Sequence, residues 1–137
     1  MKPGKILGIA FTAITLCGLL YYFMYPVVHF HRLTQKWKAE IQRNQDPAQL
    51  QAWANELMSM HGDSNKQDLL NLHGKPPSGI PRSRYGPLVY LMSNDHCVQL
   101  GWGSGMLGLW GMRIGETNYV CPGGELWKPG IYFFHSP

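Results

Sequence analysis

Twenty consecutive residues near the amino terminus, Ile6 to Tyr25, carry no charged side chain. As an α-helix, such a run would extend about 30 Å, because each residue adds about 1.5 Å along the axis. That length matches the hydrocarbon core of a bilayer. The sequence therefore predicts a transmembrane anchor over residues 1–30, which leaves roughly a hundred residues, enough for one small soluble domain.

A cleavable signal sequence is the main alternative to a retained anchor. Signal sequences have an apolar core of roughly 7 to 15 residues, followed by small residues at the cleavage site. The run in this chain is longer and ends in the bulky segment Leu19-Leu20-Tyr21-Tyr22-Phe23. A signal-anchor that stays in the membrane is therefore favoured, and membrane lipid is an expected partner.

Aromatic residues gather at the carboxyl end of the apolar run. Rings with one polar atom prefer the interface between membrane and water. We accordingly predict interface positions for four residues: Tyr21, Tyr22, Tyr25 and Trp37.

The net charge of +4 does not indicate a nucleic-acid partner. Six of the twelve lysines and arginines flank the apolar run, where membrane topology and anionic headgroups account for them. The two flanks carry nearly equal charge, so the count alone leaves orientation open. Lys2 and Lys5 resemble the basic start of an export signal, and Cys97 and Cys121 form a plausible disulfide pair. Both features favour a soluble domain on the extracytoplasmic side of the cell membrane.

Two helices are predicted over residues 31–62. The first is a juxtamembrane helix with an apolar stripe at Phe30, Leu33, Trp37 and Ile41, and it should end near Asn44. The second begins at Asp46-Pro47-Ala48-Gln49, which matches a capping box with proline in the first turn. It is amphipathic and should pack on the sheet of the same chain, through the following residues: Leu50, Trp53, Ala54, Leu57, Met58 and His61.

The rest of the chain divides into a connector and a sheet. Residues 63–87 are rich in proline and glycine and predict a surface connector. Residues 88–137 contain short apolar runs between turn residues, at 88–92, 97–102, 107–114 and 131–134. The predicted fold class is therefore α+β, with a small antiparallel β-meander of three to four strands packed on the 46–61 helix.

This order of span, juxtamembrane helix and small antiparallel sheet is similar in layout to type IV pilins and pseudopilins. The glycine, aromatic residue and glutamate expected at the start of the apolar segment are missing. Ala13 stands in the place of the glutamate if Gly8 marks the processing site. The resemblance is one of layout, and it implies a filament subunit as one alternative function.

Few residues have the spacing that chemistry would need. Cys97 and Cys121 are either a disulfide or two buried thiols. His96, Cys97, Cys121 and His135 have the atoms of a zinc site but lack a paired C-x-x-C or H-x-x-x-H motif. Gly103 to Gly108 matches G-x-G-x-x-G, but a strand candidate follows, so neither a nucleotide nor another cofactor is expected.

Aromatic residues are the notable surplus of the sheet region. An exposed subset could bind a protein partner, and we select four candidates for this surface: Trp102, Trp110, Trp127 and Tyr132. The sequence thus favours a non-catalytic, single-pass component of the cell envelope that binds protein or self-associates. An anchored thiol-dependent or metal-dependent enzyme and a pilin-like filament subunit are the alternatives.

Overall fold

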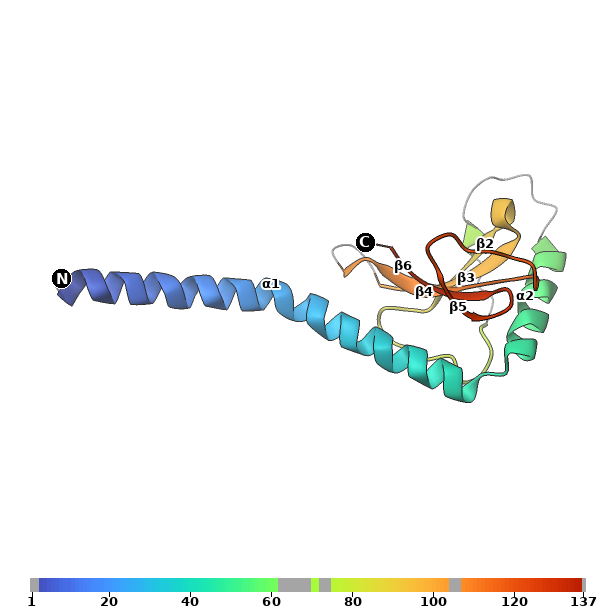
Figure 1. Cartoon of the computed structure of the whole chain (residues 1–137), viewed down its shortest axis with the longest axis horizontal. Coiled ribbons are helices and arrows are strands. Elements are labelled where there is room, and N and C mark those ends of the chain that lie inside the picture. Colours follow the sequence, from blue (N-terminus) through green and yellow to red (C-terminus); the bar gives the residue numbers. More distant parts are fainter. Residues whose placement is uncertain (1–2, 62–69, 72–74, 104–106, 137) are drawn as a thin grey trace. The chain divides into compact units, whose positions relative to one another are not determined.

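The computed structural model describes residues 3–61, 70–71, 75–103 and 107–136 of the 137-residue chain (Figure 1). The chain forms two compact units, Met1–Gln35 and Lys36–Pro137. The first is entirely helical in its described part, and the second combines helix with a β-sheet.

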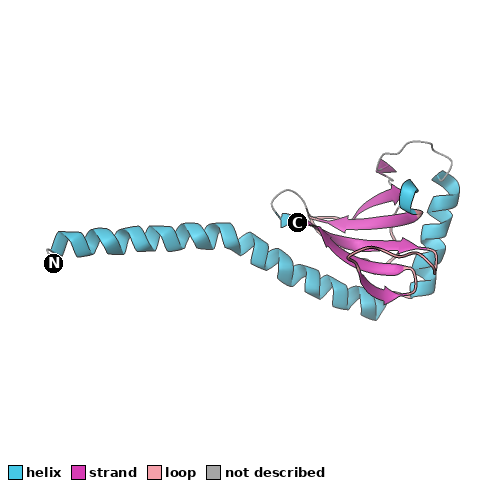
Figure 2. Ribbon diagram, turned by 45° about the horizontal axis from the view of Figure 1, so that its top comes forward, coloured by secondary structure: helices cyan, strands magenta, loops and turns pink. Residues whose placement is uncertain are grey.

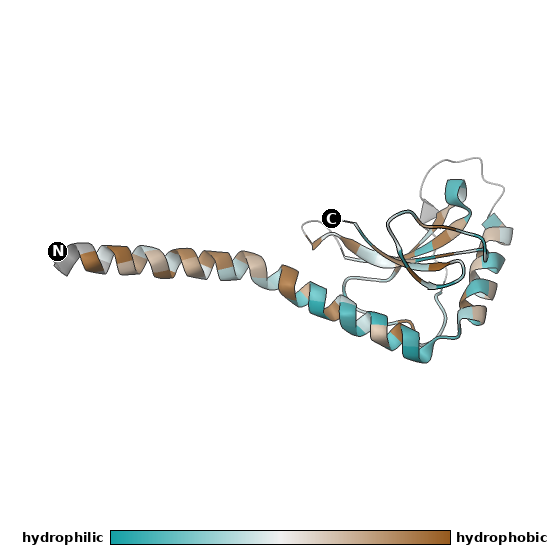
Figure 3. Ribbon diagram, in the orientation of Figure 1, coloured by the Kyte–Doolittle hydropathy of each residue, from teal (hydrophilic) through white to brown (hydrophobic). Residues whose placement is uncertain are grey.

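Helix α1, Pro3–Asn44, includes the uncharged run and continues past Pro26. Between Gly8 and Asn44 it is long and apolar enough to cross a membrane, a property that a signal sequence near the amino terminus would share. Figure 3 shows the apolar colouring of its first part and the mixed polarity of its last turns. The tyrosines predicted for the interface, Tyr21, Tyr22 and Tyr25, are exposed on this helix. Its end at Asn44 confirms the predicted boundary.

Helix α2, Pro47–His61, begins where the capping signal predicts. The backbone N–H of Ala48 donates to Oδ1 of Asp46 at 3.0 Å, so the side chain satisfies a donor that has no partner within the helix. Leu50, Ala54 and Leu57 form the buried stripe of α2. The predicted stripe extends one turn too far along the helix, because His61 at the end of α2 is exposed.

The sheet has six antiparallel strands in the order β1-β2-β3-β4-β6-β5. The predicted count of three to four strands, in a simple meander, is therefore wrong. The last strand, β6, lies between β4 and β5. It pairs with β5 across the tight turn at Pro129-Gly130, and its other edge pairs with β4. The strands span β1 Leu70–Asn71, β2 Leu88–Met92, β3 Cys97–Trp102, β4 Leu109–Gly115, β5 Glu125–Lys128 and β6 Ile131–Ser136.

One face of the sheet is buried, and we call it the closed face. Helix α2 packs against β2, β3 and β4, alongside the sheet in Figure 2. The last turns of α1 contribute Trp37 and Ile41 to the same core. Because neighbours in register point to the same side of a sheet, the closed face is a continuous apolar layer. Its buried strand residues are Val89, Leu91, Val98, Leu100, Trp102, Trp110, Met112, Ile114, Ile131 and Phe133.

Candidate functional site on the open face of the sheet

The structure places most of the predicted aromatic surface inside the protein. Trp102 is fully buried and Trp110 is 6% exposed, so the prediction of an exposed binding position is wrong for both. Their ring centroids lie 5.2 Å apart on the closed face. Trp127 is half-buried and stacks on Phe133, which also belongs to the closed face. Of the four candidates, only Tyr132 is on the opposite side of the sheet.

Trp37 is also a core residue rather than a membrane-interface residue. Its side chain is 6% exposed, and its ring centroid lies 6.0 Å from that of Trp102 and 6.2 Å from that of Trp110. The prediction was wrong because α1 continues without a break into the second unit. There Trp37 packs against residues of strands β3 and β4. An apolar stripe on a helix predicts burial but does not say whether lipid or protein buries it.

The other side of the sheet, which we call the open face, carries a row of paired residues across its strands. Tyr90 pairs with Gln99, Gln99 with Arg113, Arg113 with Tyr132, and Tyr132 with Leu126. Within the second unit, helix α2 and the last turns of α1 pack on the closed face instead. Tyr90, Arg113 and Tyr132 are half-buried, and Leu126 is 58% exposed. Other apolar residues on this face also remain accessible, among them the exposed Leu88 and the half-buried Phe134.

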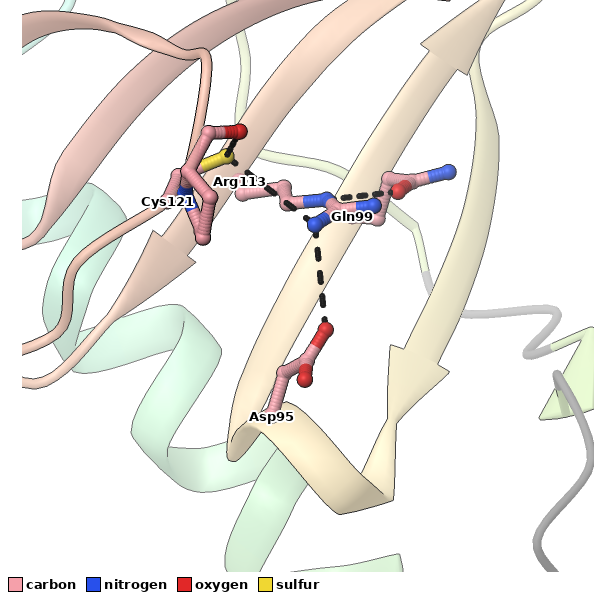
Figure 4. Close-up of polar contacts among 5 residues, drawn as sticks. Asp95, Gln99, Arg113 and Cys121 are labelled. Atoms are coloured by element: carbon pink, nitrogen blue, oxygen red, sulfur yellow. Dashed lines mark hydrogen bonds and ion pairs between the residues drawn. The ribbon is translucent and has the colours of Figure 1, made fainter.

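Arg113 is the centre of the open face (Figure 4). Its Nε donates to Oε1 of the buried Gln99 at 3.0 Å, and its Nη1 lies 3.7 Å from Oδ2 of Asp95. The same nitrogen approaches Sγ of Cys121 at 3.9 Å. The guanidinium carbon lies 5.1 Å from the centroid of the Phe134 ring. Contacts on several sides therefore hold the cation in one orientation beside an aromatic surface.

Two cysteines lie at the edge of this cluster, and they are free thiols. The predicted disulfide between Cys97 and Cys121 is not formed, and both side chains are buried. Burial raises the pKa of Cys97 from 9.0 to about 11, against opposing effects of Tyr119 and Arg113. The thiol is therefore protonated at neutral pH. Since the thiolate is the nucleophile, Cys97 is poorly suited to covalent catalysis.

The raised pKa of Cys97 predicts a loss of stability in alkali. Above pH 9.0 the unfolded chain releases the thiol proton, whereas the folded chain keeps it until about pH 11. Stability is therefore full below pH 9 and falls between pH 9 and 11, by about 2–3 kcal/mol at about 1.4 kcal/mol per pKa unit. Burial raises the pKa of Tyr119 in the same direction, so this tyrosine adds to the fall at higher pH.

Urea unfolding of the full chain at pH 8, 9 and 10 measures this effect. Cys97→Ala should lower stability at every pH but flatten the slope between pH 9 and 10, because the titrating group is gone. An equal slope in the variant would contradict the assignment to Cys97.

The four candidate metal ligands do not gather at one site in the described part of the chain. His96 is exposed in the turn between β2 and β3, with a φ of 48°, and His135 is exposed in β6. Among the residues that the structure describes, no group of three histidine, cysteine, aspartate or glutamate side chains has the arrangement of a metal site. The segment Gly103 to Gly108 leads into strand β4, not into the helix that a dinucleotide site needs, and residues 104–106 lie outside the described part.

The central residues of the open face were missed from the sequence. Asp95 lies in the turn between β2 and β3, and Gln99 and Arg113 are single polar positions in apolar strands. Within β3 and β4, large apolar residues alternate with small or polar ones, and this was a usable signal because such alternation separates the two faces of a strand. Comparisons of the chain with protein-family models, curated proteins and solved structures found no match.

Proposed function

We propose that this chain is a single-pass, membrane-anchored and non-catalytic component of the cell envelope that binds another protein. Residues 1–30 act as the anchor, and the soluble unit lies on the extracytoplasmic side. The length of the uncharged run supports the anchor, because twenty mostly apolar residues in a helix match the thickness of a bilayer core.

The open face is the observation that carries the binding proposal. Tyrosine, phenylalanine and arginine are enriched where proteins bind one another, whereas lysine and glutamate are depleted. Among the described strand residues that point to this side, Arg113 is the only charged one. Leu88 and Leu126 are exposed beside it, so partner binding would remove their apolar surface from water.

The charge of Arg113 and the apolar residues around it indicate the chemistry of the partner. Arg113 has Asp95 as its carboxylate neighbour, at 3.7 Å and with the aspartate side chain 44% exposed. A partner carboxylate could replace or join Asp95 at the guanidinium, which donates paired hydrogen bonds to carboxylate oxygens. We therefore propose a protein surface with aliphatic side chains around one carboxylate as the occupant of the open face.

A photo-crosslinking experiment in intact cells tests both parts of the proposal. A benzophenone amino acid replaces Leu126 in the full chain, and Met60 on α2 is the matched control because its exposure is nearly the same, 60% against 58%. Membranes are then washed with alkaline carbonate before electrophoresis. We expect a retained chain of 15.5 kDa that forms one discrete protein adduct from position 126 and none from position 60.

Two results would overturn the proposal separately. A shorter chain released from the washed membranes would contradict the anchor. Equal adducts from both positions, or none from position 126, would contradict binding at the open face.

A further inference from the structure

A second feature of the soluble unit concentrates positive charge in one pocket, which we call the basic pocket. It is lined by residues 75–76, 82–84 and 86–88 and has a volume of about 560 Å³. Lys75, Arg82 and Arg84 all contribute to it, and no carboxylate is among its lining residues. In the described part of the chain these three side chains form no ion pair with an acidic residue. The three positive charges repel one another, and an anion bound between them would reduce this repulsion.

The backbone that carries these cations is attached to the sheet. Nε1 of the buried Trp102 donates to the carbonyl oxygen of Pro81 at 3.0 Å, and the N–H of Gly103 donates to that of Tyr85 at 2.8 Å. Ser83 and Gly86 exchange two backbone hydrogen bonds, of 2.8 and 3.2 Å, and so close the turn. These bonds fix the backbone on either side of Arg82 and Arg84 to the sheet. The two arginines therefore start from fixed backbone positions.

Gly86 shows how closely this turn approaches the sheet. Its φ is +137°, and a Cβ at this position would lie 2.6 Å from the carbonyl oxygen of Gly101. Only glycine combines that backbone conformation with such a contact. The turn is thus packed directly on strand β3.

Arg84 is oriented before any ligand arrives. Its Nη2 donates to the hydroxyl of Tyr85 at 2.6 Å, and its guanidinium carbon lies 4.8 Å from the centroid of the same ring. A stacked guanidinium loses less side-chain freedom when it binds, and its remaining N–H groups match the oxygens of a phosphate. Pre-orientation of this kind lowers the entropic cost of binding.

We infer that the basic pocket binds a phosphate group, through Arg82 and Arg84 with Lys75 adding charge. The group can belong to the headgroup of an anionic phospholipid or to a soluble phosphate compound, because both offer the same anionic oxygens. This inference is independent of partner binding at the open face, where Arg113 and Leu126 are the residues under test.

Calorimetric titration of the full chain in phosphatidylcholine nanodiscs tests the inference. The probes are inorganic phosphate and glycerophosphoglycerol, the soluble headgroup of phosphatidylglycerol, with acetate as an anion of another shape. The double variant Arg82→Gln/Arg84→Gln should weaken phosphate binding by about tenfold or more, since charged hydrogen bonds to the ligand are removed. Tighter binding of glycerophosphoglycerol would identify a lipid headgroup as the source, and tighter binding of inorganic phosphate a soluble compound.

The matched control is Arg43→Gln/Lys128→Gln, which removes the same charge from exposed positions of the same unit outside the pocket. It should change the affinity by less than about twofold, because exposed charges outside the pocket are largely screened by salt. Equal losses in the two double variants, binding of acetate as tight as that of phosphate, or no binding of either phosphate probe at millimolar concentration would each overturn the inference. Unchanged tryptophan fluorescence spectra would show that both double variants are folded.

Discussion

Replacing Trp102 with alanine is expected to lower the free energy of unfolding by about 3–5 kcal/mol, as removal of a fully buried large side chain does. Trp102 is 0% exposed and packs against the rings of both Trp37 and Trp110. The change also leaves the carbonyl oxygen of Pro81 without its indole donor, which adds the cost of an unpaired buried acceptor. Helix, strand and connector therefore lose contact at one site.

Urea unfolding of the full chain in a non-ionic detergent measures this loss. All five tryptophans lie in Lys36–Pro137, so tryptophan fluorescence reports on this unit alone. Trp127→Ala is the control, because this half-buried residue lies in the edge strand β5. It should cost clearly less than Trp102→Ala, and equal losses would show that Trp102 is not the centre of the core.

Gly130→Ala is also expected to be strongly destabilising, with a loss of about 3 kcal/mol or more. Gly130 turns the chain from β5 into β6 with a φ of +78°. For alanine, that backbone conformation costs about 1–2 kcal/mol. Its Cβ would also collide with the carbonyl oxygen of Glu116 and lie 2.9 Å from that of Gly115. Backbone atoms cannot rotate away as a side chain can, so the strand pair β5-β6 would have to shift.

Gly123→Ala separates the cost of the backbone conformation from the cost of the Cβ clash. Gly123 has almost the same backbone conformation, a φ of +73°, but no atom lies within 4 Å of the Cβ that alanine would add. It should therefore lose only the conformational part, about 1–2 kcal/mol. The urea midpoints of both variants measure the difference, and a Gly130→Ala loss no greater than that of Gly123→Ala would refute the predicted clash.

The features that could be predicted from the sequence depend on neighbours along the chain. The start of α2 at Asp46-Pro47 and the end of α1 at Asn44 follow from capping and apolar periodicity. Strands β2, β3, β4 and β6 follow from short apolar runs between turns. Strand β5 was missed because Glu125 and Lys128 interrupt its apolar character, although Pro129-Gly130 before an apolar run was a recognisable hairpin turn.

The site could not be predicted in the same way, because it depends on pairing between distant segments. Gln99 and Arg113 are neighbours only through the register of β3 and β4, and Tyr132 joins them through β6. The aromatic residues show the same limit. Composition indicates a surplus of rings, but only the packing of Trp37 against Trp102 and Trp110 reveals which rings are buried.

The sequence by itself determined the long apolar helix, the second capped helix and four of the strands, since helix and strand signals are local and repeat every few residues. Only the tertiary structure decided which face of the sheet is closed, where β6 enters the strand order, and that Arg113 and the basic pocket stand as separate charged sites. The physical reason is that burial and charge proximity are set by contacts between residues far apart in the chain, and no local pattern encodes the register that brings them together.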